Sequence, residues 1–202
     1  KPSGVCAHQC WSQTMALQPL IEGMLGYRPD ATECKITLEP AFPVHWDNAQ
    51  VSNICMADQA IDLTMNRKTN STAYLMKKTG SRELNMLFNP YLPVGSQIDS
   101  VMLNGSRLDY QTRRGEEFVQ LQTNFTLDKE SHLAVYYKQG FAVVPPTSSP
   151  NPGAQSGGVR IIHTNLRDNI YTITVEGPAG STKMLEVLTG DNKVKYVERA
   201  RL

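Results

Sequence analysis

The sequence lacks several features that would assign it at once to a functional class. No apolar run approaches the roughly 20 residues that a helix needs to cross a bilayer, and residues 1–25 lack the basic start and apolar stretch of a signal peptide. A large net charge is also lacking, because 20 Lys and Arg residues are balanced by 19 Asp and Glu residues. A chain so balanced has no long-range field to attract nucleic acid or an anionic membrane, so we expect neither as a partner.

Cysteine is scarce and unevenly placed. All four cysteines lie before residue 56, at Cys6, Cys10, Cys34 and Cys55, whereas a disulfide framework normally spans the fold that it stabilises. A chain of 202 residues can bury a core without such crosslinks. We therefore expect free thiols.

Recognisable motifs for catalysis, metal binding and nucleotide binding are absent as well. The glycine-rich stretch 153–158 lacks the Lys-Ser/Thr ending of a phosphate-binding loop. Residues 6–10 offer two thiols and an imidazole, but no second half of a zinc site follows them. The carboxylates lie mostly in predicted turns, as at 116–117 and 128–130, rather than in the pair that glycoside hydrolysis requires. We expect no metal, no cofactor and no catalysis by this chain alone.

One helix is predicted, at the start of the chain. Between residues 9 and 25 the large apolar side chains recur at helical spacing, and Gly26 supplies a stop. The apolar positions cover more than one stripe, so this helix requires cover on several sides, as an inner helix of a barrel has. Pro19 removes a backbone donor, which predicts a kink. The apolar positions are Trp11, Met15, Leu17, Leu20, Ile21, Met24 and Leu25.

From residue 29 onward the pattern changes to short β-branched and aromatic runs separated by Gly, Pro, Asn and Asp, which is typical of a sandwich. Asn104-Gly105 between two such runs is a strong signal for a two-residue hairpin. The sequence therefore predicts a mainly β fold, an antiparallel β-sandwich preceded by one N-terminal α-helix. Predicted strands cover 34–38, 50–56, 60–66, 71–77, 82–88, 98–103, 118–122 and 132–138.

The last quarter of the chain is separated from these strands by residues 145–158, which are rich in Pro, Ser and Gly and predict a flexible loop. Four more strands are predicted beyond it. A unit of four short strands has marginal stability alone, so we expect these strands to complete the same sandwich. The predicted organisation is then a terminal helix at 1–28 followed by one domain covering 29–202. The four strands are 159–164, 170–176, 183–188 and 194–199.

The N-terminal segment resembles the end of a known catalytic domain. Gly4-Val5-Cys6, followed by Gln9, Trp11 and Ser12, is similar to the Gly-Cys-x-x-Gln-x-Trp-Ser pattern that ends the (α/α)6 barrel of bacterial glycogen-debranching-type glycoside hydrolases. The stretch 17–26 resembles the last barrel helix, and 30–46 resembles the connection to the β-sandwich that follows the barrel. The chain begins at Lys1 rather than Met, and we expect it to be part of a longer polypeptide.

This resemblance implies a function. Gln9, Trp11 and Ser12 match the motif near the barrel mouth, where Trp lines a sugar subsite and Gln binds hydroxyl groups. The catalytic carboxylates of such enzymes lie on earlier barrel helices, so this chain would be the non-catalytic domain that braces the missing barrel of a hydrolase of α-glucans or related glycans. The exposed helix would then favour self-association. An exported parent would place the domain in the periplasm or outside the cell rather than in the cytoplasm.

A carbohydrate-binding module is the alternative that stays open. Exposed aromatic side chains on a sandwich can stack on sugar rings, although alternation places one of each adjacent aromatic pair in the core. An independent hydrolase is a third hypothesis, and it predicts turnover by the isolated chain. The candidate aromatics are Trp46, Tyr74, Tyr91, Tyr110, Tyr136 and Tyr137.

Overall fold

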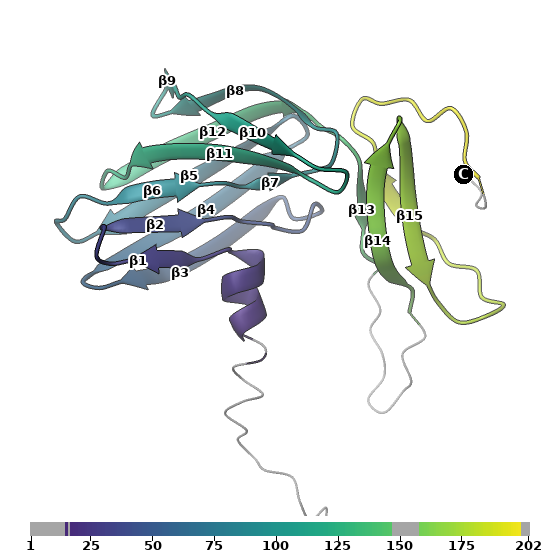
Figure 1. Ribbon diagram of the computed structural model, residues 1–202, viewed down its shortest axis with the longest axis horizontal. Helices are drawn as coiled ribbons and strands as arrows, with labels where there is room; N and C mark the ends of the chain where they lie inside the picture. Colours follow the sequence, from purple (N-terminus) through teal and green to yellow (C-terminus); the bar gives the residue numbers. More distant parts are fainter. Residues whose placement is uncertain (1–14, 16, 147–157, 199–202) are drawn as a thin grey trace, which may run out of the picture.

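Two β-sheets of six strands each pack face to face in the computed structural model, which describes residues 15, 17–146 and 158–198 (Figure 1). The predicted fold class is confirmed, because the described chain is mainly β, with antiparallel sheets and one short helical segment. No helix among the described residues combines the length and the apolar composition needed to span a membrane.

The first sheet, here called sheet I, contains one parallel pair in an otherwise antiparallel arrangement. Its order is β1, β2, β6, β11 and β10, with β7 also paired to β11, and the parallel pair is β2 with β6. The strands are β1 (Arg28–Asp30), β2 (Lys35–Leu38), β6 (Asn85–Phe88), β7 (Tyr91–Leu92), β10 (Gln111–Arg114) and β11 (Val119–Thr126).

The second sheet, sheet II, is antiparallel throughout and begins with three strands joined by short turns. Its order is β3, β4, β5, β12, β8 and β9. The predicted hairpin at Asn104-Gly105 joins the last two of these strands, and both turn residues have positive φ, 50° and 82°, as a type I′ turn requires. The strands are β3 (Asn48–Met56), β4 (Gln59–Lys68), β5 (Ser71–Thr79), β8 (Gln97–Leu103), β9 (Ser106–Arg107) and β12 (Glu130–Lys138).

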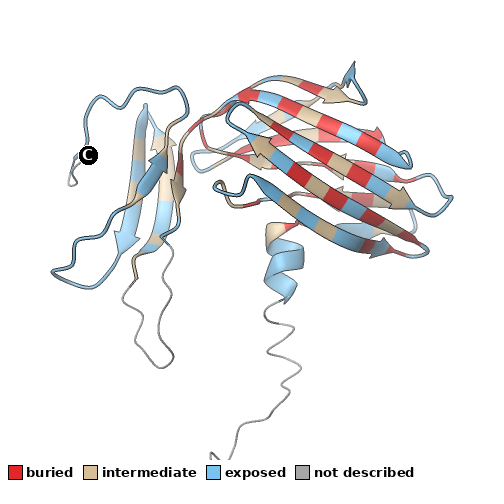
Figure 2. Ribbon diagram, turned by 180° about the vertical axis from the view of Figure 1, so that it is seen from behind, coloured by how far each residue is buried: buried red, intermediate tan, exposed pale blue. Residues whose placement is uncertain are grey.

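The core lies between the two sheets and follows the period of two that the sequence shows. Figure 2 shows buried and exposed residues alternating along the central strands. On β12, Tyr137 is buried whereas the adjacent Tyr136 is exposed, as alternation predicts. Tyr74 of sheet II contacts Phe88 of sheet I edge to face, with ring centroids 4.8 Å apart. Burial of each such side chain contributes about 1.5–3 kcal/mol, so this layer stabilises the sandwich.

The helical segment differs from the predicted α-helix. Met15, Leu17 and Gln18 are α-helical, and a π-helix, η1 (Pro19–Met24), follows them. The transition occurs at Pro19, which has no N–H to continue the α-helical ladder, and the Leu25 N–H then bonds to the Leu20 carbonyl at 3.0 Å. Residues 9–14 of the predicted helix lie outside the described residues.

The strands beyond residue 141 form two small sheets of their own. β13 (Ala142–Val144) pairs with β16 (Glu186–Leu188), and β14 (Arg160–Arg167) pairs with β15 (Ile170–Glu176). Neither pair joins sheet I or sheet II, so the expectation that these strands complete the sandwich was wrong. The predicted strand at 194–199 is also not found, since 194–198 is described without a strand and 199 lies outside the description. Most of the predicted loop, 147–157, lies outside the description as well.

Candidate functional site

The C-terminal end of the helical segment is attached to the sandwich by backbone hydrogen bonds. Glu39 N–H donates to the Leu25 carbonyl at 3.0 Å, and Ala41 N–H donates to the Met24 carbonyl at 2.8 Å. Leu25 is buried in the core. At Gly26, where φ is +63°, a Cβ atom would lie 2.6 Å from the Glu39 Cβ, so only glycine allows the chain to turn this closely into β1.

The opposite end of this segment presents apolar side chains to solvent. We define the helix surface as Met15, Leu17, Leu20 and Ile21, which are 69%, 56%, 49% and 44% exposed. Figure 1 shows the segment projecting from one side of the sandwich. Clustered apolar side chains are unusual on the surface of a monomeric domain and are typical of an interaction site. The cover that the sequence predicts for this helix is therefore not supplied by the described residues.

The crossover from sheet I to sheet II, residues 39–47, lies against the base of this helix. Arg67 on β4 holds the crossover: its Nη1 donates to the Pro43 carbonyl at 2.7 Å, and it has longer contacts to the Phe42 and Trp46 carbonyls at 3.4 Å. The Trp46 ring stacks on Phe42, with centroids 6.5 Å apart, and is 38% exposed. The helix base and an exposed tryptophan thus belong to one hydrogen-bonded framework.

The outer face of sheet II is a second candidate surface. Strand register places Tyr136 beside Ser71, and one row further along the strands it places Ala134 beside Ala73 and Asn66. Small side chains therefore form a flat floor next to a tyrosine that is 46% exposed. Such a face is suited to stacking one sugar ring on Tyr136 while amide groups bind hydroxyls.

The other predicted platform aromatics are not available on this face. Tyr74 and Tyr137 are buried in the core, and the Tyr137 hydroxyl bonds to Thr72 Oγ1 at 2.9 Å. The Tyr110 hydroxyl donates to the Ile98 carbonyl at 3.2 Å. Tyr91 packs edge to face on Phe118, with centroids 5.5 Å apart. Of the six predicted aromatics, only Tyr136 and Trp46 are exposed.

Ionisable groups are distributed as on an ordinary surface. Glu130 lies 2.9 Å from the His132 ring and 3.2 Å from Lys77, and the hydrogen bond to His132 followed by that to Lys77 lowers the pKa of its carboxyl group. Glu116 pairs with Arg167, and Glu22 on the helix accepts a bond from Gln18. The described part of the chain contains no group of three residues arranged to hold a metal ion.

Both described cysteines, Cys34 and Cys55, are free. The residues that the family resemblance selects, Gln9, Trp11 and Ser12, lie outside the described residues, as do Cys6, His8 and Cys10. No sequence signal had singled out Arg67, although an arginine at the end of a long apolar strand is a candidate for holding a neighbouring loop. No protein-family model matches this sequence, and no curated protein is similar enough to match it.

Proposed function

We propose that this chain is a non-catalytic β-sandwich domain that docks, through the helix surface and the crossover beside it, onto a catalytic barrel of a glycoside hydrolase acting on α-glucans or related glycans. The observation that carries this proposal is the attachment of the helix. Its base is held by two backbone hydrogen bonds to the crossover, whereas its apolar residues remain uncovered among the described residues.

This arrangement is more typical of a domain that packs against another domain than of one that functions alone. A helix that served only to cap the sandwich would direct its apolar side chains toward the sheets, as Leu25 does. The four residues of the helix surface are exposed instead. Arg67 holds the adjacent crossover by a hydrogen bond to Pro43, and Trp46 on that crossover stacks on Phe42. The family that the N-terminal motif resembles supplies a barrel at this position.

The test begins with the DNA upstream of Lys1. We expect it to continue the reading frame with alternating amphipathic helices that carry two carboxylates. A start codon and signal peptide immediately before Lys1 would overturn the proposal. The isolated chain should not hydrolyse glucans, and turnover that persists in a pure preparation would equally refute it.

The second step tests the docking surface. The upstream polypeptide, produced as a separate chain, should co-purify with this one, and L17E/I21E should weaken the complex at least tenfold because it places two charges in an apolar interface. V194E/V197E is the matched control, since it adds the same two charges at side chains that are 47% and 39% exposed but lie in the C-terminal segment. Equal loss with both variants would argue against the helix surface.

A carbohydrate-binding module is the second candidate, favoured by the exposed Tyr136 above its flat floor. If this face binds glycans, calorimetric titration with soluble glucans should give a heat that Y136A abolishes. Y196A is the control, because Tyr196 is also a tyrosine and, at 64%, is more exposed than Tyr136, but lies outside sheet II. A titration without heat would exclude this candidate.

A further inference from the structure

Among the described residues, the edge strands of sheets I and II are protected against pairing with another chain. The edge strand β1 consists of Arg28, Pro29 and Asp30, which combine charge with a residue that has no N–H. The edge strand β3 is interrupted by a bulge at Asn53, where φ is +61°, and bulges also discourage pairing. β9 has only two residues, and β10 ends in Arg113 and Arg114.

The strand β15, Ile170–Glu176, in the hairpin with β14, lacks such protection. Its first six residues, Ile-Tyr-Thr-Ile-Thr-Val, contain no charge, no proline and no glycine. Every one of them is β-branched or aromatic, the residue types most common in paired strands. A long, uncharged edge of this composition is the kind that pairs with another strand.

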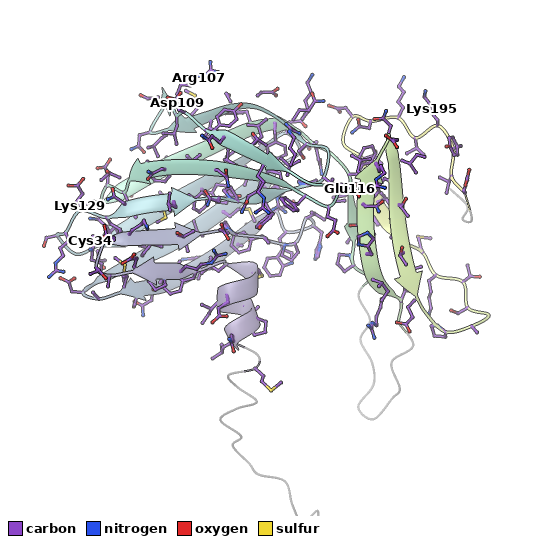
Figure 3. The ribbon with its side chains drawn as sticks, in the orientation of Figure 1. Cys34, Arg107, Asp109, Glu116, Lys129 and Lys195 are labelled. Carbon is purple, nitrogen blue, oxygen red and sulfur yellow. The ribbon has the colours of Figure 1, made fainter. Side chains whose placement is uncertain are left out.

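The hydrogen-bonding geometry identifies which backbone groups of β15 are free. Leu166 on β14 lies opposite Tyr171 on β15, yet the Leu166 N–H donates outward, to the Glu116 carbonyl of the sandwich, at 2.6 Å. Figure 3 shows Glu116 on the side of the sandwich that faces this hairpin. Leu166 and Tyr171 are therefore a non-hydrogen-bonded pair, so the N–H and C=O of Tyr171 point away from β14.

The same direction recurs at every second residue, so Ile173 and Val175 also present their backbone groups to the open edge. None of these groups bonds to the backbone of another described segment. The other edge of the hairpin differs, because the sandwich itself occupies it through Glu116. The β14–β15 hairpin thus has one edge covered and one edge open within the described part of the chain.

We propose that β15 pairs antiparallel with β15 of a second copy, about a twofold axis that passes through Ile173. This register places Tyr171 opposite Val175 of the second copy and Ile173 opposite Ile173 of the second copy. All the outward backbone groups of the three residues are then paired, because they become the hydrogen-bonded positions of the new ladder. A register centred on Thr172 would fail, since its backbone groups point toward β14.

The side chains are compatible with this register. Tyr171, Ile173 and Val175 lie on one face of the hairpin, where Tyr171 stacks on Phe141 with ring centroids 5.5 Å apart. The new four-stranded sheet would continue this apolar face across both copies. Thr172 would face Thr174 of the second copy, a favourable cross-strand pair. Glu176 would face Ile170 of the second copy, so no like charges lie opposite each other. The interface is self-complementary, as a twofold dimer requires.

This proposal does not depend on the proposed function, because it concerns a different part of the chain from the helix surface. Sedimentation of the full chain should show a monomer–dimer equilibrium at micromolar concentrations. I173K should weaken the dimer by at least about tenfold, because it places two like charges opposite each other on the axis. I170K is the matched control, since it places lysine opposite Glu176 and should leave the dimer intact.

Two further measurements separate loss of pairing from loss of folding. Mixing I173K with I173E should restore association as a heterodimer, which a misfolded hairpin cannot do. In the unmodified chain, hydrogen exchange at Tyr171, Ile173 and Val175 should slow as protein concentration rises. A chain that stays monomeric, or a dimer that resists I173K but is lost in L17E/I21E, would overturn the proposal.

Discussion

Replacement of Arg67 by Met tests how the crossover beside the helix is held. Its guanidinium group donates to three carbonyl groups of residues 42–46, at 2.7 Å to Pro43 and at 3.4 Å to Phe42 and Trp46. Its own backbone N–H also bonds to the Asp47 carbonyl at 2.7 Å, a contact that R67M retains. Met preserves most of the apolar stem, so the variant removes chiefly the charged donor.

The expected destabilisation follows from the short contact. A hydrogen bond with a charged partner contributes about 1.5–3 kcal/mol, and the two contacts at 3.4 Å add little because they are near the limit of hydrogen-bond length. We expect R67M to lower the free energy of unfolding by about 2 kcal/mol, which for a chain of this size lowers Tm by about 4–8 °C. R67K should recover part of this loss, because ammonium keeps the positive charge but donates from a single nitrogen rather than from a planar fork.

Denaturant unfolding and tryptophan quenching together measure the effect. The chain has two tryptophans. The reference protein and every Arg67 and Arg107 variant therefore carry W11F, so that the fluorescence comes from Trp46 alone. R67M should increase quenching by acrylamide, because a released crossover exposes this ring further. R107M is the control, since Arg107 is exposed at the end of β9 (Figure 3). A loss of stability no greater in R67M than in R107M would refute the reasoning.

Two other predictions concern buried groups. Burial raises the pKa of Tyr74 above its ordinary value of 10.0, so the folded protein keeps a proton that the unfolded chain releases, and stability falls as pH rises above 10. Y74F should make the free energy of unfolding fall less steeply with pH, by up to about 1.4 kcal/mol per pH unit. Urea titrations between pH 9 and 11 measure this slope, and Y136F is the control. At Gly140 a Cβ atom would lie 2.0 Å from the Val94 carbonyl oxygen, so calorimetry should find G140A destabilised by more than about 2 kcal/mol. G23A should be neutral or stabilising, because its Cβ atom would have no atom within 4 Å apart from those of neighbouring residues and its own helix backbone.

The sandwich strands are predictable because alternation is a local property. β4 repeats an inward apolar residue at every second position, with Ile61, Leu63 and Met65 all buried, and each of these positions can be recognised without knowledge of a partner strand. Short strands escape such prediction. β10 reads Gln-Thr-Arg-Arg, and only its register with β11 makes it a strand.

The local sequence pattern does not show whether the last strands join the sandwich. The pattern finds β14 and β15 almost within their observed bounds, but whether they join the sandwich depends on a free edge. The edges of sheets I and II are closed by short, charged or bulged strands. Likewise, helical spacing predicts the apolar positions of the N-terminal helix but not the π-helical turn that begins at Pro19.

The candidate surfaces show the same division. Alternation correctly separates Tyr136 from Tyr137, whereas the role of Arg67 emerges only from tertiary structure, since its carbonyl partners lie more than 20 residues earlier in the chain. The site residues taken from the family resemblance lie outside the described residues, so they remain predictions.

The parallel pairing of β2 with β6 has a consequence for the order of folding. β3, β4 and β5 form a meander of adjacent strands, which can assemble early because its contacts are local. β2 must wait for β6, which follows that entire meander in the chain, and the crossover after β2 supplies the bonds that hold the helix base. Although the helix is near the beginning of the chain, we expect it to be among the last elements to reach its place during synthesis.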